Sequence, residues 1–290
     1  MSLGVVFKSP EGLVLAADSR VTVTGTLPVS PTLAPVVPGA PTPPAVVQLL
    51  PAYFDSATKL LSVKSQRHIG FLTYGAGSIG QTEPRTAHGY IPELETHLAT
   101  QGTDRLSVEA FAREVSTFYL QQWTTGGMPL APLPPNIQPM IFLIAGFDEG
   151  EPHGKVFEVS IPNQLDPVEH HRGTFGIIWG GMTQFLERFL NGVDPQAAEI
   201  AKTTLNLDDA QVNTLKQKWM ESLVLAVPYQ FLPLQDCVDM ATFLVSITSE
   251  IQTWMVSIRG VGGDVDVATI TRTEGFVPIS QKHIHSWGGD

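Results

Sequence analysis

Two short apolar runs, joined by a tight turn, open the sequence. Residues 3–8 and 13–17 are rich in small and branched side chains, and Ser9-Pro10-Glu11-Gly12 between them has proline and glycine where a type I turn favours them. Residues 13–17 are apolar at every position, which is typical of a strand buried on both faces. Asp18 follows directly, and a carboxylate at the end of a buried strand requires a partner. The sequence therefore predicts a hairpin in the core with a partnered acid at its end.

The rest of the chain alternates between groups of strands and groups of helices. Turn signals between neighbouring strands favour antiparallel pairs over β-α-β units, so we expect an α+β fold of antiparallel sheets covered by helices. Further strands are predicted over residues 57–63, 69–74, 140–147, 155–161, 176–179 and 265–271, and helices over 92–100, 108–123, 183–190, 195–225 and 236–255.

Prolines concentrate in two segments. Residues 28–51 hold eight of the 23 prolines and residues 129–139 hold five. Such density is typical of a loop or polyproline-like excursion rather than a packed element. We therefore expect one domain, residues 1–290, enlarged by a proline-rich insertion at 24–52, a proline-rich loop at 124–139 and a helical insertion at about 195–232.

Composition excludes several classes of protein. Seventeen Lys and Arg against 28 Asp and Glu give a net charge of −11, which disfavours a nucleic-acid binder. We expect no membrane partner, because the apolar runs are too short to span a bilayer or are broken by prolines. A single cysteine, Cys237, excludes an internal disulfide, and the first residues lack the basic region of a secretory signal. We expect a cytoplasmic protein.

Three segments carry a family resemblance. Residues 2–20, which begin Ser2-Leu3-Gly4-Val5-Val6-Phe7-Lys8, resemble without a gap the opening of proteasome β-type subunits and their bacterial relatives, which are N-terminal nucleophile hydrolases. Thr58-Lys59-Leu60-Leu61 resembles the lysine-bearing strand of that family, and residues 68–77 resemble its next strand and glycine turn. The resemblance implies a four-layer αββα sandwich, with two facing antiparallel sheets and helices outside.

The resemblance also implies a catalytic set of Ser2, Asp18, Lys59 and Gly75. Removal of Met1 would free the α-amine of Ser2, which titrates near pKa ~8 and could take the hydroxyl proton. Lys59 would ease formation of the alkoxide, Asp18 would hold Lys59, and the Gly75 N–H would stabilise the oxyanion. Two alternatives remain open: Asp18 could form a structural ion pair with Arg20, and Lys59 could be a surface lysine.

The same resemblance implies a substrate pocket. It would be lined by Val21, Ala57, Leu61, Thr73 and Gly77, a mostly apolar set that favours cleavage after medium apolar residues.

The sequence also departs from the family pattern. Serine replaces the usual threonine at position 2, and the serine of the glycine turn is absent from Ile178-Trp179-Gly180-Gly181-Met182. The segment 257–263 has no aspartate in register, and Ser257 is a candidate substitute hydroxyl.

We therefore expect an amide hydrolase that needs no cofactor and no metal. The resemblance implies a self-compartmentalised, threonine/serine-type peptidase that acts on peptides or unfolded proteins. It further implies a homo-oligomeric ring or helical assembly, with an ATP-dependent unfoldase as a further partner. A catalytically silent structural subunit and a small-molecule amidase of the same superfamily are the alternatives.

Two other motifs carry less weight. The glycine spacing of Gly75-x-Gly77-x-x-Gly80 matches a dinucleotide-binding fingerprint, but the predicted elements around it form no β-α-β unit. The clusters Glu169-His170-His171 and His283-Ile284-His285 lack a matched third metal ligand, so surface positions are favoured.

Overall fold

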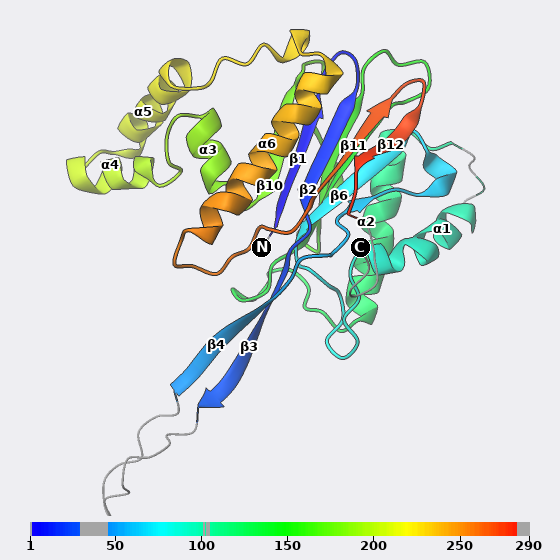
Figure 1. Cartoon of the computed structure of the whole chain (residues 1–290), viewed down its shortest axis with the longest axis horizontal. Helices are drawn as coiled ribbons and strands as arrows, with labels where there is room; N and C mark the ends of the chain where they lie inside the picture. The colour runs from blue at the N-terminus through cyan, green and yellow to red at the C-terminus, as the bar shows by residue number, and fades with distance from the viewer. Residues whose placement is uncertain (1, 30–45, 101, 103–104, 283–290) are drawn as a thin grey trace, which may run out of the picture.

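The structure is a computed structural model that describes residues 2–29, 46–100, 102 and 105–282. Its strands form two five-stranded antiparallel sheets and one two-stranded ribbon (Figure 1). The first sheet has the order β10-β1-β2-β11-β12. Its strands are β1 (Leu3–Lys8), β2 (Leu13–Asp18), β10 (Gly176–Gly181), β11 (Val265–Thr271) and β12 (Gly275–Ser280).

The predicted hairpin is present at the centre of this first sheet. β1 pairs with β2 in the register Gly4↔Ala17, and the Ser9 amide donates to the Gly12 carbonyl over 3.0 Å to close the turn. Every residue of both strands is buried, as the unbroken apolar pattern predicts. β2 also pairs with β11, so the end of β2 lies between two neighbouring strands.

The second sheet has the order β5-β6-β7-β8-β9. Its first strand covers only two residues of the seven predicted over 57–63. β9 was not predicted because most of its side chains are polar and face solvent, which leaves no apolar pattern to detect. The five strands are β5 (Leu60–Leu61), β6 (Ile69–Gly75), β7 (Met140–Gly146), β8 (Lys155–Ile161) and β9 (Gln164–His170).

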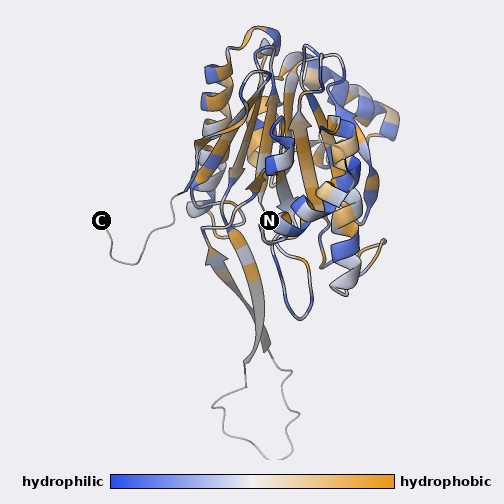
Figure 2. Ribbon diagram, turned by 90° about the vertical axis from the view of Figure 1, so that its right-hand side faces the viewer, coloured by the Kyte–Doolittle hydropathy of each residue, from blue (hydrophilic) through white to orange (hydrophobic). Residues whose placement is uncertain are grey.

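Helices cover the outer faces of both sheets. α1 (Ile91–Thr100) and α2 (Val108–Thr125) share one core with the second sheet, where Phe111 of α2 lies 5.6 Å from Phe71 of β6, measured between ring centroids. α3 (Gln184–Leu190) and α6 (Leu234–Thr253) share another core with the first sheet. A third core, drawn from β1, β2, β6, β7 and β11, lies where the two sheets face each other, and Figure 2 shows hydrophobic residues concentrated along the strands.

The proline-rich insertion corrects one expectation. Residues on both sides of the prolines form an antiparallel ribbon of β3 (Val21–Val29) and β4 (Val46–Phe54), which projects away from the two sheets (Figure 1). Prolines 28 and 51 lie within these strands, where we expected a loop. A two-stranded ribbon tolerates them because each strand has one edge without a neighbour, where no N–H is needed for pairing. Residues 30–45, which hold the remaining six prolines, lie outside the described residues.

The two other insertions differ from each other. Residues 126–139 form no helix or strand, as expected for the second proline cluster. The helical insertion consists of α4 (Ala197–Leu205), α5 (Asp209–Ser222) and a 3-10 turn (Tyr229–Phe231), and α4 and α5 lie beside α3 at the outside of the molecule (Figure 1). A capping box between Asp208 and Gln211 begins α5. In the described part of the chain, no helix has both the length and the apolar character needed to cross a bilayer.

Candidate active site

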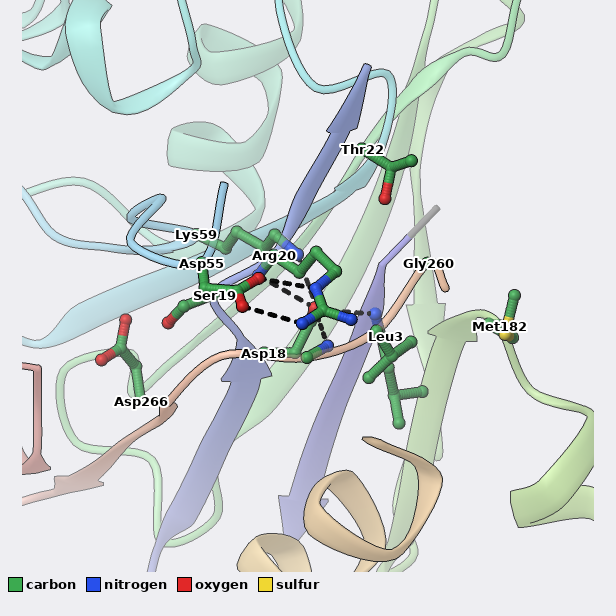
Figure 3. A network of polar contacts seen from close by, with 12 residues as sticks. Leu3, Asp18, Ser19, Arg20, Thr22, Asp55, Lys59, Met182, Gly260 and Asp266 are labelled. Carbon is green, nitrogen blue, oxygen red and sulfur yellow. Dashed lines mark hydrogen bonds and ion pairs between the residues drawn. The ribbon is translucent and has the colours of Figure 1, made fainter. Parts of the chain in front are cut away.

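Asp18 lies at the end of β2 with only 1% of its surface exposed, and its carboxylate accepts four hydrogen bonds (Figure 3). Oδ1 accepts from Lys59 Nζ over 2.6 Å and from the Leu3 amide over 2.9 Å. Oδ2 accepts from the Gly262 amide over 3.1 Å and the Arg20 amide over 3.2 Å. These donors compensate the buried charge. Asp18 thus connects the first residues of the chain, Lys59 and the loop before β11.

Lys59 precedes β5 and points inward. Its side chain is 6% exposed, and its backbone carbonyl accepts from the Thr73 amide over 3.0 Å, which anchors the segment to β6. Burial lowers the pKa of Lys59, while the charge of Asp18 opposes this effect. Lys64, the other lysine of the segment, is exposed on a 3-10 turn. Lys59 is therefore a buried amine that gives up its proton more readily than an ordinary lysine.

Ser2 is held by its main chain on both sides. Its carbonyl accepts from the Met182 amide over 2.8 Å, and the next amide, that of Leu3, donates to Asp18. Gly181 makes this close approach possible, because a Cβ there would lie 1.9 Å from the Ser2 carbonyl oxygen. Ser2 is 6% exposed and lines two cavities.

Gly75 ends β6 in a conformation that glycine favours. Its φ is +87°, and a Cβ would lie 2.1 Å from the carbonyl oxygen of Pro139. That carbonyl also accepts from the Ala76 amide over 2.9 Å, so the turn after β6 is fastened to the segment before β7. Gly75 lines the larger of the two cavities together with Ser2.

The smaller cavity has a volume of about 20 Å³ and contains most of the expected substrate pocket. Four of the five predicted pocket residues line it, namely Val21, Ala57, Thr73 and Gly77, together with Ser2 and Lys59. The volume is close to the space of one water molecule, smaller than the medium apolar side chain that we expected there. Among the described residues, the buried Thr73 hydroxyl has no hydrogen-bond partner.

Leu61, the fifth predicted pocket residue, lies elsewhere. It is 1% exposed and belongs to the core between the second sheet and α1 and α2. It is part of the two-residue strand β5, two positions beyond Lys59.

The side chains of Arg20 and Ser257, the two further candidates from the sequence, do not join the catalytic set. The Arg20 guanidinium forms a double ion pair with Asp55, at 2.6 and 2.7 Å, and stacks over Tyr53 at the base of the ribbon. Only the backbone amide of Arg20 donates to Asp18. The structure therefore has neither of the two alternatives left open: Asp18 pairs with Lys59 instead of the Arg20 guanidinium, and Lys59 is buried. Ser257 is exposed in the segment between α6 and β11.

Sequence reasoning missed Gln252 of α6, which is 1% exposed. Its Oε1 accepts from the Gly260 amide over 2.7 Å and the Val261 amide over 3.1 Å, and its Nε2 contacts Met182 Sδ. Gln252 therefore links the loop that contacts Asp18 to the turn that holds Ser2. A signal existed, because Gln252 follows Thr248 by four residues on the buried face of α6.

The weaker motifs find no support in the part of the chain that the structure describes. Gly75, Gly77 and Gly80 follow a strand whose neighbours are both antiparallel, so the β-α-β unit of a dinucleotide site is absent there. His171 contacts the Ile177 carbonyl, and no group of three His, Cys, Asp or Glu residues within the described ranges could hold a metal. The cluster at 283–285 lies outside the described residues.

Comparisons with known proteins bear on the fold. No family model matches the sequence, and no curated protein matches it. Among solved structures, the chain is similar to a Gly-1 mutant of Anbu from Hyphomicrobium sp. strain MC1, with a TM-score of 0.53 and 16% identity. The alignment covers 97% of this chain and 86% of that one. Anbu is a bacterial proteasome-like protein of the N-terminal nucleophile hydrolase superfamily, so the comparison shows a proteasome-like fold.

Proposed function

We propose that this protein is an N-terminal nucleophile amide hydrolase, a peptidase built as a single domain on a four-layer αββα sandwich. The observation that carries the proposal is the buried Lys59–Asp18 pair beside Ser2, with 2.6 Å between Lys59 Nζ and Asp18 Oδ1. Burying a lysine costs free energy, because the ammonium group loses its hydration. A buried lysine beside Ser2 therefore favours a functional role for Lys59. The shared fold with Anbu supports the same superfamily.

The proposed mechanism uses four residues. After removal of Met1, which lies outside the described residues, the Ser2 hydroxyl attacks the carbonyl carbon of the amide. The proton of the Ser2 hydroxyl passes through Lys59, in its neutral form, to the Ser2 α-amine and then to the leaving amine. The Gly75 N–H stabilises the oxyanion, and Asp18 keeps Lys59 in place. Water then hydrolyses the acyl-serine ester and restores Ser2. This scheme uses no metal and no organic cofactor.

The cavities suggest the substrate class. The side chain before the scissile bond would occupy the small cavity of about 20 Å³, which favours glycine, alanine or serine. The large cavity is open enough for an extended chain, with a volume of about 410 Å³. We therefore propose a peptide or unfolded protein as substrate. A cytoplasmic location, a ring or helical homo-oligomer and an ATP-dependent unfoldase partner are part of this proposal and rest on the family resemblance.

Intact mass and peptide hydrolysis test the proposal together. The mass should show loss of Met1, and a peptide epoxyketone should add to the N-terminal residue through its hydroxyl and amine. The Ser2→Ala variant should lose both labelling and hydrolysis, whereas Ser257→Ala should keep them. A protein that has lost Met1 but shows neither labelling nor hydrolysis would be a silent structural subunit. Hydrolysis of small amides but not peptides would assign a small-molecule amidase.

A further inference from the structure

The larger cavity beside Ser2 is lined by acidic side chains but by no basic ones. Eleven residues line it. They come from Ser2, the end of β6, the segment before β7, the end of β10 with the turn that follows it, helix α3 and the segment after α3. Two of them are acidic, Glu187 and Asp194, and none is Lys, Arg or His. The cavity is therefore an anionic environment for any group that enters it.

The two acids differ in their contacts. Asp194 accepts from the Gln196 amide over 2.7 Å and pairs with Arg188, and the Gln196 amide together with Arg188 and Gln184 lowers the pKa of Asp194. Its charge is thus already compensated. Glu187 lies on the same face of α3 as Thr183 and Gln184, which also line the cavity. Among the described residues, the partly buried Glu187 carboxylate has no hydrogen-bond or ion-pair partner.

The position of this carboxylate relative to Ser2 determines which part of a substrate it would meet. Ser2 lines both cavities, and Lys59 lines only the smaller one. An amide attacked by Ser2 has an acyl arm and a leaving-group arm. If the acyl side chain occupies the smaller cavity, the leaving-group arm extends past Gly75 and Met182 toward α3.

We propose that Glu187 is a specificity-determining residue, an inference that rests on the proposed function. Glu187 would select substrates that carry a cationic side chain, lysine or arginine, directly after the scissile amide. The ammonium or guanidinium would pair with the Glu187 carboxylate. Asp194 would not be the direct partner, because Arg188 and the Gln196 amide occupy its oxygens.

Internally quenched peptides that differ only in the residue after the scissile bond test this inference. We expect wild-type kcat/KM to be about fivefold higher with lysine than with glutamine there, the size of one partly exposed ion pair. Glu187→Gln should abolish the difference, and Glu187→Lys should favour glutamate instead. The preference should also shrink as salt is raised from 50 mM toward 1 M, since ions screen the pair.

A matched control removes the same charge from a neighbouring helix. Glu199 of α4 is exposed and does not line the cavity, so Glu199→Gln should keep the lysine preference. Equal cleavage of the lysine and glutamine peptides by wild type, or a preference that survives in Glu187→Gln, would overturn the inference while leaving the peptidase activity established. A preference for lysine before, rather than after, the scissile bond would also overturn it. Absence of all hydrolysis by protein that has lost Met1 would instead remove the proposed function and this inference with it.

Discussion

Lys59 Nζ lies 2.6 Å from Asp18 Oδ1, and both side chains are almost completely buried although the residues are 41 positions apart in the chain. Breaking one partner of such a pair leaves an uncompensated charge in the core. Asp18→Asn should therefore lower the free energy of unfolding by about 3 kcal/mol, as measured by urea denaturation.

The ion pair between Arg20 and Asp55 is the matched control for that prediction. Asp55 accepts from Arg20 over 2.6 Å, but its side chain is 47% exposed. Asp55→Asn should cost less than about 1 kcal/mol, because water screens the pair. Equal losses in the two variants would show that burial of the Asp18–Lys59 pair has no energetic role.

The lowered pKa of Lys59 predicts how hydrolysis and stability depend on pH. Its pKa lies below the ordinary value of 10.5, so hydrolysis should rise with pH along a limb centred below 10.5. The unfolded chain keeps this proton up to about pH 10.5, whereas the folded chain loses it earlier. Between the two pKa values the unfolded state binds more protons, so the free energy of unfolding should also rise with pH in that interval.

Lys59→Arg keeps the positive charge but cannot release a proton in this range. It should lower kcat/KM by about 100-fold and remove the alkaline limb from the pH profile. Lys155→Arg is the control, since Lys155 forms its ion pair with Asp148 at a partly exposed site outside both cavities. An unchanged limb in Lys59→Arg would mean that another group carries the proton.

Gly75 combines a positive φ with a close backbone neighbour, and the two effects can be separated. Gly150→Ala tests φ alone, because φ is +77° there and no atom lies within 4 Å of a new Cβ. It should cost about 1 kcal/mol. Gly75→Ala should cost clearly more, because Pro139 must move, and it should lower kcat as the turn shifts. Thermal denaturation and single-turnover hydrolysis measure the two effects, and equal costs for both variants would contradict the close contact.

Gln252 should affect both stability and activity. Gln252→Leu leaves the buried amides of Gly260 and Val261 without an acceptor, which should cost about 2 kcal/mol. Because Gln252 also contacts Met182, which holds Ser2, kcat should fall while KM changes little. Gln217→Leu on the exposed face of α5 should change neither quantity. A loss of stability with unchanged kcat would limit Gln252 to a structural role.

Substitution of Thr73 should raise the stability of the protein, whereas substitution of Gln252 should lower it. Its buried hydroxyl has no partner among the described residues, so the isosteric Thr73→Val should raise the free energy of unfolding by about 1 kcal/mol. Valine also suits a strand position such as β6. A loss of stability on denaturation would show that a water in the small cavity satisfies the hydroxyl.

Local patterns in the sequence were sufficient for several elements. The turn at residues 9–12 and the unbroken apolar run after it predict the β1–β2 hairpin, since both depend on neighbouring residues only. The helix predicted over residues 108–123 is also present, and Phe111, Val115 and Phe118, which recur at helical spacing, lie on its buried face. The ribbon β3–β4 escaped prediction, because its prolines are tolerated only in strands that lack a neighbour on one side.

The amino-acid sequence by itself determined the strand and helix periods, the turns and the family resemblance that singles out Ser2, Asp18, Lys59 and Gly75. Only the tertiary structure decided which side chains meet. Asp18 pairs with Lys59, whereas Arg20 turns to Asp55, because their partners are supplied by segments about 40 residues further along the chain. Gln252 approaches Met182 from 70 residues away, and Glu187 faces the Ser2 cavity only because α3 packs beside it. Such contacts depend on the packing of whole sheets and helices, which no local pattern encodes.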